Sequence, residues 1–513
     1  MDAAPAPLPD DNVHGAEAPL VFTHRQIQKV IVGVLLCILL AAIDQTVVIP
    51  AVPSIAADLN GFGHLAWIVT AYLLTSTVAT PIYGKLSDIY GRRALLLPAI
   101  VLFVVASMLC GFATSLLQLI VARALQGLGG AGLLSMAQAA IADVVSPRER
   151  GRYQGYMAGT WGVASVAGPI IGGWVTDAFS WRWIFWVNLP IGIGAYLLSS
   201  STLKMLPVRR HAAVIDYAGA ALLAVSTTLV LLVMSWGGTE YAWSSPVILG
   251  MIGLAAVLVV VLVRQQRLAA EPMMPPRLFA NAVFSRGVAM AALNSGALFG
   301  ATFLLPLFFQ LLRGADASTS GTLVVPFLVT TSVGAFIGGL IARRLGRVKP
   351  LIKAGNTATV IGFVLLALMG IDTPQWLTVI DMVVVGLGIG FVMPCVLVSI
   401  QNAADRRDVG AATGAFLFLR SMGGAVGSTL TGVVLAAQFA AAMARLGVPP
   451  SVDMGALRGH EGAVLALDPN VLAAARYGVA SAFHAGFAAC TVLSVISLIV
   501  CWSLPDVKLR TTN

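Results

Sequence analysis

Long, continuous apolar runs alternate with short polar connections along most of this chain. About 20 apolar residues suffice to cross a bilayer as a helix, and the runs lack the alternation of barrel strands. The pattern therefore predicts an all-α integral membrane protein with fourteen transmembrane helices. We expect these helices at residues 30–52, 65–83, 95–115, 116–138, 155–175, 183–203, 215–235, 246–264, 287–311, 321–342, 350–371, 376–398, 410–436 and 482–504.

The distribution of basic residues predicts the orientation. With the N-terminus inside, 24 of the 31 Lys and Arg residues lie in the tails and inside loops, and five lie outside. Arg123 and Arg420 remain within spans. Because cytoplasmic loops carry the excess of Lys and Arg, we expect a multi-pass protein of the cell inner (cytoplasmic) membrane with both termini cytoplasmic.

The composition excludes several other classes of protein. Hydrophobic residues make up 58% of the chain and charged residues only 10%, too few charges to cover a soluble fold. A soluble globule, a disordered chain and a nucleic-acid binder are therefore excluded, and the net charge of +9 is mainly an orientation signal. The five cysteines lie in apolar runs, where we expect them to pack without disulfides or metal.

Two loop segments repeat each other. Gly84 to Arg93 follows the second span and Gly339 to Arg347 follows the tenth, both with glycines seven residues apart, although Arg343 stands where the first copy has Asp88. Repeated halves are typical of transporters with a central site. The expected organisation is a cytoplasmic tail (1–28), a six-helix bundle (29–205), an inserted helix pair with a linker (206–285), a second six-helix bundle (286–505) with a long outside loop (436–480), and a cytoplasmic tail (506–513).

Five motifs carry a resemblance that covers the chain after residue 28. They are Asp44-Gln45-Thr46-Val47-Val48, the Gly84–Arg93 loop, Arg123-Ala124-Leu125-Gln126-Gly127, Gly168-Pro169-Ile170-Ile171-Gly172-Gly173 with Gly162, and Trp181 through Asn188-Leu189-Pro190. Together they resemble the major facilitator superfamily, specifically its fourteen-spanning drug:proton antiporters of the multidrug efflux type. The resemblance implies two six-helix bundles that rock around a central cavity, with the span-five motif typical of antiport.

A charged pair is expected in the membrane. Asp44 lies 15 residues past Lys29, about 22 Å along a helix, so it comes within roughly 8 Å of the outer edge of a 30 Å core. Arg123 enters span four from outside and reaches about 10 Å depth by the same rise. Since an ionised side chain in a span is costly and usually functional, we interpret Asp44 as the proton carrier and Arg123 as the group that tunes it, against the alternative of a static ion pair.

Two further motifs predict helix contacts. Asp88 and Arg92 are four residues apart and share a helical face; the gating loop Gly84, Asp88, Gly91, Arg92 and Arg93 is interpreted as an inside latch, as the resemblance implies, rather than as plain positive-inside anchoring. In the antiporter motif Gly162, Gly168, Pro169, Gly172 and Gly173, Gly168 and Gly172 continue a small-residue stripe from Ala164 that allows close helix packing. Pro169 favours a bend.

The remaining polar residues in the spans are weaker candidates for a role in transport. We place Gln126, Asn294, Gln310 and Arg420 on the substrate pathway. Asp381 is expected to be solvated near the outer end of its helix, and His484 to make a polar contact at a helix start.

We therefore predict a proton-coupled antiporter that exports amphipathic, drug-like compounds. No phosphate-binding GxxxxGK[ST] segment, HExxH motif or nucleophile–base pair occurs, so we expect no enzyme, no metal and no cofactor, with transport driven by the proton gradient. The partners are protons, the lipid bilayer and a lipophilic or amphipathic small molecule, and the chain is expected to act as a monomer. The alternatives are a dedicated exporter of one endogenous metabolite or lipid-like compound and a transporter-like membrane sensor.

Overall fold

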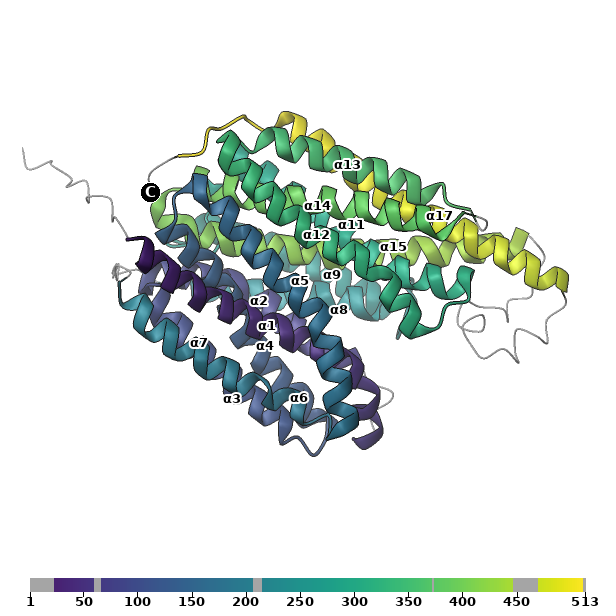
Figure 1. Cartoon of the computed structure of the whole chain (residues 1–513), viewed down its shortest axis with the longest axis horizontal. Helices are drawn as coiled ribbons and strands as arrows, with labels where there is room; N and C mark the ends of the chain where they lie inside the picture. Colours follow the sequence, from purple (N-terminus) through teal and green to yellow (C-terminus); the bar gives the residue numbers. More distant parts are fainter. Residues whose placement is uncertain (1–22, 60–65, 206–214, 371–372, 446–468, 511–513) are drawn as a thin grey trace, which may run out of the picture.

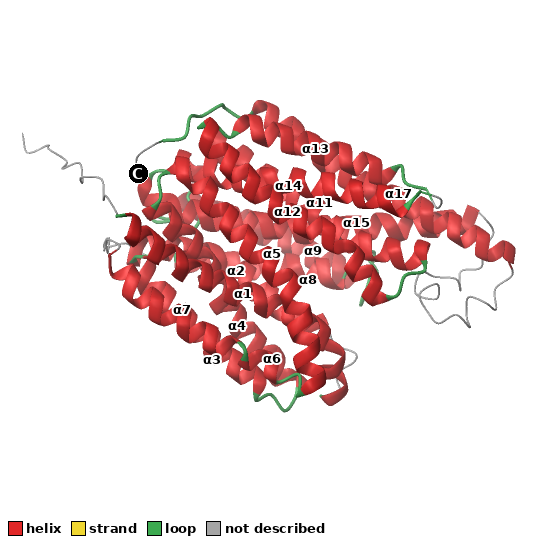
Figure 2. Cartoon of the chain, in the orientation of Figure 1, coloured by secondary structure: helices red, strands yellow, loops and turns green. Residues whose placement is uncertain are grey.

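The computed structural model describes residues 23–59, 66–205, 215–370, 373–445 and 469–510. Within these ranges the regular structure is helical (Figure 2). Most of the predicted N-terminal tail (1–22), the last three residues of the predicted C-terminal tail (511–513) and the centre of the predicted outside loop (446–468) lie outside the described residues.

The helices of the first half begin with a long one capped by Thr23, whose side chain accepts from the Gln26 amide. They are α1 (His24–Asp58), α2 (Ala66–Tyr90), α3 (Arg92–Gly111), α4 (Leu116–Val144), α5 (Pro147–Ala178), α6 (Trp183–Trp186), α7 (Asn188–Thr202) and the short 3₁₀ turn η2 (Leu203–Met205).

The remaining helices form a pair and a second bundle. They are α8 (Tyr217–Trp236), α9 (Pro246–Leu268), α10 (Pro276–Ala280), α11 (Ala282–Arg313), α12 (Ala317–Leu345), α13 (Lys349–Ala367), α14 (Gln375–Ala403), η3 (Arg406–Asp408), α15 (Val409–Arg445) and α17 (Pro469–Ser503).

Twelve helical segments among the described residues are long and apolar enough to cross a membrane, α6 and α7 counting as one. The helices α2 and α5 are long enough but are not among the twelve: α2 carries several threonine and serine residues, and α5 carries seven glycines and several charged residues. The chain is thus a multi-pass membrane protein.

The helices form two bundles with separate apolar cores. Two buried clusters consist of residues between Val30 and Leu203, and the other two, apart from Ala142, of residues between Leu278 and Leu509. We call these the N-terminal bundle (α1 to α7) and the C-terminal bundle (α11 to α17). All five cysteines are buried and unpaired, as expected.

The two bundles meet at one end of the molecule and diverge at the other (Figure 1). The meeting end, at the left of Figure 1, is where α1 begins and α17 ends, and we call it the terminal end. There the amide of Arg148, in the first turn of α5, donates to the carbonyl of Arg510. The pair α8 and α9 lies behind the bundles in this view and contacts α2 and α15.

Helix extends into both ends of the predicted outside loop 436–480. Helix α15 continues to Arg445 and α17 begins at Pro469, so ordered helix occupies both ends of that range. Residues 436–445 are rich in alanine, the best helix former, which explains why the helix continues beyond the apolar run.

Candidate functional site

The structure brings Asp44 and Arg123 into direct contact inside the N-terminal bundle. Asp44 Oδ2 accepts from the Arg123 guanidinium at 2.7 Å, and Asp44 Oδ1 accepts from the amides of Gln126 and Asn188, each at 2.8 Å. Three donors from two helices therefore surround one carboxylate. This geometry suits an ionised Asp44, because a carboxylate only accepts hydrogen bonds.

Arg123 is held on its other sides as well. It donates to Gln126 Oε1 at 2.7 Å and to the Ile68 carbonyl at 3.2 Å. Its guanidinium carbon lies 4.6 Å from the ring centroid of Tyr72 and 5.8 Å from that of Phe185, distances at which a cation is attracted to an aromatic face.

Asn188 reaches Asp44 from the first position of α7, within the sixth predicted span. Helix α6 ends at Trp186 and α7 begins at Asn188, so the Asn188 side chain lies at a helix junction. Its amide also donates to Ser107 of α3 at 3.0 Å, and the Ser107 hydroxyl donates to the Phe185 carbonyl at 2.8 Å.

The cluster of Asp44, Arg123, Gln126, Asn188 and Ser107 is sealed from solvent. Each of these residues is at most 1% exposed. A buried ion pair of this kind is weak evidence for stability, since desolvation opposes the attraction, but removing one partner leaves an uncompensated charge and is strongly destabilising. The cluster is therefore a candidate for function rather than a simple device for stability.

A second polar group lies where α2 meets α15 at the terminal end. The Asp88 carboxylate accepts from the backbone amides of Gly410 at 2.9 Å and Ala411 at 2.7 Å, the first turn of α15. Helix N-termini present unpaired amides and a positive dipole to an anion. Asp88 thus joins the N-terminal bundle to the C-terminal bundle.

The rest of the gating loop supports Asp88. Arg92 pairs with Asp88 and with Asp143, each at 2.8 Å, and donates to the Ser87 hydroxyl. Arg93 adjoins this network, and its Nε is buried without a partner among the described residues.

The geometry explains why glycine occupies both positions 84 and 91 of the loop. Gly91 has φ 86° at the start of α3, a conformation that favours glycine. A Cβ at Gly84 would lie 2.6 Å from the Gly410 carbonyl oxygen, so α2 and α15 approach through bare backbone.

The linker after α9 reinforces this contact. Glu271 pairs with Lys85 of α2 at 2.5 Å, and Arg277 of α10 makes two bonds, at 2.8 and 2.9 Å, to Asp408, the residue before α15. The hydrogen bond to Asp408 raises the pKa of Arg277 above its ordinary value. The linker therefore ties both partners of the α2–α15 contact at the terminal end.

The second copy of the loop makes a different contact, between α5 and α12. Arg343, which replaces the aspartate of the first copy, pairs with Glu149 in the first turn of α5 at 2.9 Å. A Cβ at Gly151 would lie 2.8 Å from the Gly339 carbonyl oxygen. The glycine contact is thus repeated, whereas the ionic contact has its charges reversed.

The antiporter-motif glycines face three surroundings. Side chains at Gly168 and Gly172 would collide with Thr46 and Val47 of α1, and a Cβ at Gly162 would lie 2.8 Å from the Ser332 hydroxyl of α12. Gly173 meets nothing within 4 Å. Pro169 lies inside α5 in this stretch and removes one helix hydrogen bond. The motif therefore lets α5 pack closely on α1 of its own bundle and on α12 of the C-terminal bundle.

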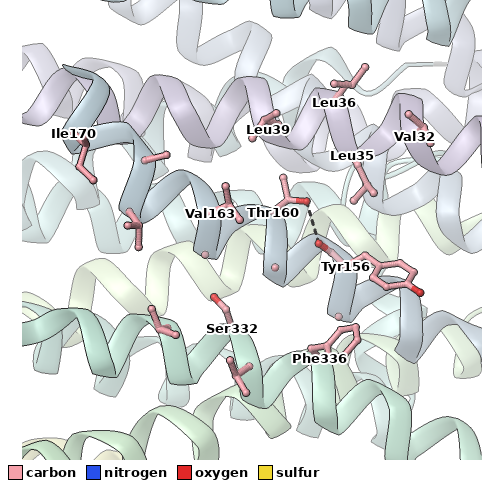
Figure 3. A pocket seen from close by; sticks show the side chains of 17 residues that line it. Val32, Leu35, Leu36, Leu39, Tyr156, Thr160, Val163, Ile170, Ser332 and Phe336 are labelled. Atoms are coloured by element: carbon pink, nitrogen blue, oxygen red, sulfur yellow. Dashed lines mark hydrogen bonds between the residues drawn. The ribbon is translucent and has the colours of Figure 1, made fainter. Parts of the chain in front are cut away.

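An apolar pocket lies along α5, with α1 on one side and α12 on the other (Figure 3). Its volume is about 1070 Å³, at the upper end of small-molecule sites. Leu35 and Leu39 of α1, Val163 of α5 and Phe336 of α12 project toward it (Figure 3). No charged side chain lines it, and its hydroxyls come from Tyr156, Thr160 and Ser332.

The other pathway candidates do not gather at this pocket. Gln126 belongs to the Asp44 cluster. Asn294, placed on the pathway by the sequence, is fully buried and bonded to Asn356 and Ser497 of the C-terminal bundle, so it lines no open passage in this structure. Gln310 donates to Ser320 at 2.9 Å, and Arg420 is partly exposed on α15.

Two expectations outside the main site have different outcomes. The expectation that Asp381 is solvated is wrong, because the residue is 7% exposed, and packing of α14 against α13 covers it. His484 makes a 2.6 Å contact with the Met369 carbonyl, the polar contact that we expect, although it lies within α17 rather than at its start.

Four important residues are missing from the sequence-based site. Asn188 lies in a segment noted for its resemblance, without an assigned role. Tyr72 is explained from the sequence as part of an interfacial aromatic belt, and Ser107 and Glu149 carry no local signal. Each acquires its role through a contact with a distant helix, which no spacing along the chain reveals.

The buried ion pair, the two bundles and the repeated loops define a membrane transporter rather than an enzyme. Residues 34–428 match the model of the Major Facilitator Superfamily, and the chain belongs to that family.

Relatives support this assignment. The chain is 37% identical over 410 residues to the multidrug transporter protein MdtP of Bacillus subtilis (strain 168), covering 80% of this chain and 75% of that one. It is 35% identical over 407 residues to multidrug resistance protein 3 of the same organism, covering 79% of each. Among solved structures, the proton:xylose symporter XylE shares the fold, with a TM-score of 0.63 at 14% identity, over 95% of this chain and 98% of that one.

Proposed function

We propose that this chain is a proton-coupled antiporter that exports amphipathic, drug-like compounds across the cytoplasmic membrane. The observation that carries the proposal is the sealed Asp44–Arg123 pair, held by Gln126 and Asn188 inside a transporter fold. A carboxylate in a membrane span is costly, and proton relays are a common reason to keep one there. Both relatives described above carry multidrug names, which supports the export of drug-like compounds.

The membrane arrangement follows from the same proposal. We take α2 and α5 as membrane spans alongside the twelve apolar segments, which gives fourteen, with α8 and α9 as a hairpin inserted between two six-helix bundles. The excess of basic residues in the loops at the terminal end supports a cytoplasmic location for that end. In this conformation the cytoplasmic end is closed by Asp88 and Arg343, and rocking of the bundles would open it.

The apolar pocket supports a lipophilic substrate. It lies between α1, α5 and α12, so both bundles contribute to its wall, and rocking changes its shape. Side chains such as Val163 and Ile170 are more than 60% exposed and line this pocket, so its accessible surface is apolar. The hydrocarbon part of an amphipathic compound therefore suits this pocket better than a strongly hydrated group does.

The test uses everted vesicles with an imposed proton gradient and a panel of lipophilic dyes. We expect a transported dye to dissipate the gradient with the wild type and with Asp381→Asn, a matched buried carboxylate. Asp44→Asn should reduce this proton flux at least about tenfold, the effect of a 1.4 kcal/mol loss.

Equal proton flux in Asp44→Asn and the wild type would overturn proton coupling through Asp44. A wild type that responds to no dye in the panel, but to one cellular metabolite, would replace multidrug export by dedicated export.

A further inference from the structure

The Asn188 side chain carries an unsatisfied atom in the sealed cluster. Its amide nitrogen donates to Asp44 at 2.8 Å and to Ser107 at 3.0 Å, while its Oδ1 is buried and has no hydrogen-bond partner among the described residues. A buried acceptor without a donor costs free energy, so this arrangement calls for an explanation.

The second amide at Asp44 is fixed in one orientation. Gln126 donates to Asp44 at 2.8 Å, while its Oε1 accepts from Arg123 at 2.7 Å and from the Cys110 thiol at 3.6 Å. Turning Gln126 over would point its amide hydrogens at the guanidinium, which can only donate. Asn188 has no such restriction, because its other partner, the Ser107 hydroxyl, can donate or accept.

A protonated Asp44 needs an acceptor for its new hydrogen. Arg123 offers none, and Gln126 is committed. The other titratable groups near Asp44 are Tyr72 of α2 and Cys110 of α3, both of which interact electrostatically with Asp44 and Arg123. Along α6, and along α5 from residue 157 to residue 176, the sequence has no titratable side chain. The Asn188 carboxamide is therefore the acceptor that can be supplied by a simple rotation.

We propose that the Asn188 carboxamide turns over when Asp44 takes up a proton, so that its Oδ1 accepts the new Asp44 hydroxyl. Asn188 is then the positioning residue that sets the pH at which Asp44 loads. This inference rests on the proposed role of Asp44 as the proton carrier and adds the group that senses the proton.

The rotation links the proton to the backbone. In the ionised arrangement Ser107 donates to the Phe185 carbonyl at 2.8 Å, next to the α6–α7 junction. After the rotation, Asn188 Oδ1 lies toward Ser107 as well, so the Ser107 hydroxyl can leave Phe185 and donate to Asn188. Proton uptake at Asp44 thereby frees a carbonyl at the helix junction.

The test is a pH titration of the purified full chain in liposomes, followed by infrared difference spectroscopy in H₂O and D₂O. The only probe is the proton, so no substrate is needed. The band of protonated Asp44 is the carboxylic-acid band missing from Asp44→Asn. In the wild type we expect this band to appear together with an amide change that is absent from Asn188→Leu.

Asn188→Leu should change two measured quantities. The Asp44 acid band should move to higher frequency, because its hydroxyl loses its acceptor. The midpoint of protonation should rise by about 0.7 pH unit, roughly a fivefold gain in proton affinity, since the ionised form loses a stronger, charge-assisted bond than the neutral form does.

Ser107→Ala provides a second variant in case Asn188→Leu does not fold. It removes the partner that favours the ionised arrangement, so the midpoint should rise by less, about twofold in affinity, with an unchanged band frequency. A frequency and midpoint that stay at the wild-type values in Asn188→Leu, or an unchanged midpoint in Ser107→Ala if the first variant is unfolded, would overturn the rotation.

The two proposals fail in different ways. If Asp44→Asn keeps every acid band of the wild type, Asp44 does not take up the proton and the proposed function fails with it. If the Asp44 band is present but Asn188→Leu leaves it unaltered, only the role of Asn188 is lost.

Discussion

The two contacts that close the terminal end use the same backbone packing and different electrostatics. Where α2 meets α15, Asp88 is about 5% exposed on its side chain and accepts two backbone amides of α15. Where α5 meets α12, the Arg343 and Glu149 side chains are about two-fifths exposed and pair at 2.9 Å, and the Arg343 carbonyl accepts from the exposed Arg148 side chain at 3.2 Å. We call these the α2–α15 seam and the α5–α12 seam. The comparison teaches that a repeated loop can keep its glycines and its position while exchanging its anchoring chemistry.

The first way to break this comparison is to remove Asp88. Asp88→Ala deletes two hydrogen bonds to a charged group, each worth about 1.5–3 kcal/mol, and leaves the α15 amides uncapped. Spin labels at Tyr90→Cys and Arg406→Cys, both exposed at the terminal end, should report a long-distance population that rises at least tenfold. An unchanged distance distribution would mean that Asp88 does not hold the seam closed.

The second test compares the glycines of the two seams directly. Gly84→Val and Gly339→Val each place a side chain against the backbone of the other bundle, and overpacking of this kind costs about 1–3 kcal/mol. We expect similar opening in both variants by the same spin-label distance, because the backbone contact is the shared feature. Opening by only one of them would show that one seam carries the closure alone.

The third test reverses the exposed ion pair. Glu149→Arg or Arg343→Glu alone should favour the open form only slightly, since exposed pairs contribute about 0.2–1 kcal/mol. The double variant Glu149→Arg with Arg343→Glu should return to the wild-type distance distribution, and high salt should reduce the effect of the single variants. If either single variant opens the terminal end as much as Asp88→Ala does, the two seams do not differ in electrostatic strength.

The smallest effect should come from a matched pair of glycines along α5. A Cβ at Gly155 would lie 2.8 Å from the Phe336 Cα, whereas Gly159, one turn further, meets nothing within 4 Å. Gly155→Ala should lower the melting temperature, and Gly159→Ala should leave it unchanged or raise it, since alanine favours a helix by up to about 1 kcal/mol. An equal fall in melting temperature in both variants would mean that the close contact between α5 and α12 is not at Gly155.

Much of the fold could be predicted from hydrophobic patterning. The expected spans coincide with the helices, including the α8–α9 pair, and the errors occur where alanine-rich sequence extends helices, as at residues 436–445. The approach of Asp44 to Arg123 could also be predicted from the sequence, because the depth of a residue in the membrane follows from its position along the helix. These features depend on local sequence and on the fixed rise of a helix.

The rest depends on contacts between distant helices. Arg343 is visible in the sequence as a departure from Asp88, but Glu149, its partner, lies 194 positions earlier in a different helix. Asn188 of α7 contacts Asp44 of α1, 144 positions earlier in the chain, and Asp381 is buried in the C-terminal bundle. No periodicity along the chain encodes these pairings.

The α8–α9 pair makes the two membrane-facing sides of the molecule unequal. Trp236 of α8 contacts Trp67 of α2, and Thr429 of α15 donates to the Met234 carbonyl of α8, so α8 bridges α2 and α15 away from the terminal end. Helices α5 and α12 lie in front of the α8–α9 pair in Figure 1, and the apolar pocket lies along them. The α8–α9 pair therefore covers the α2–α15 side of the molecule, whereas no such pair covers the α5–α12 side among the described residues. A solute dissolved in the lipid would reach the apolar pocket more readily from the α5–α12 side.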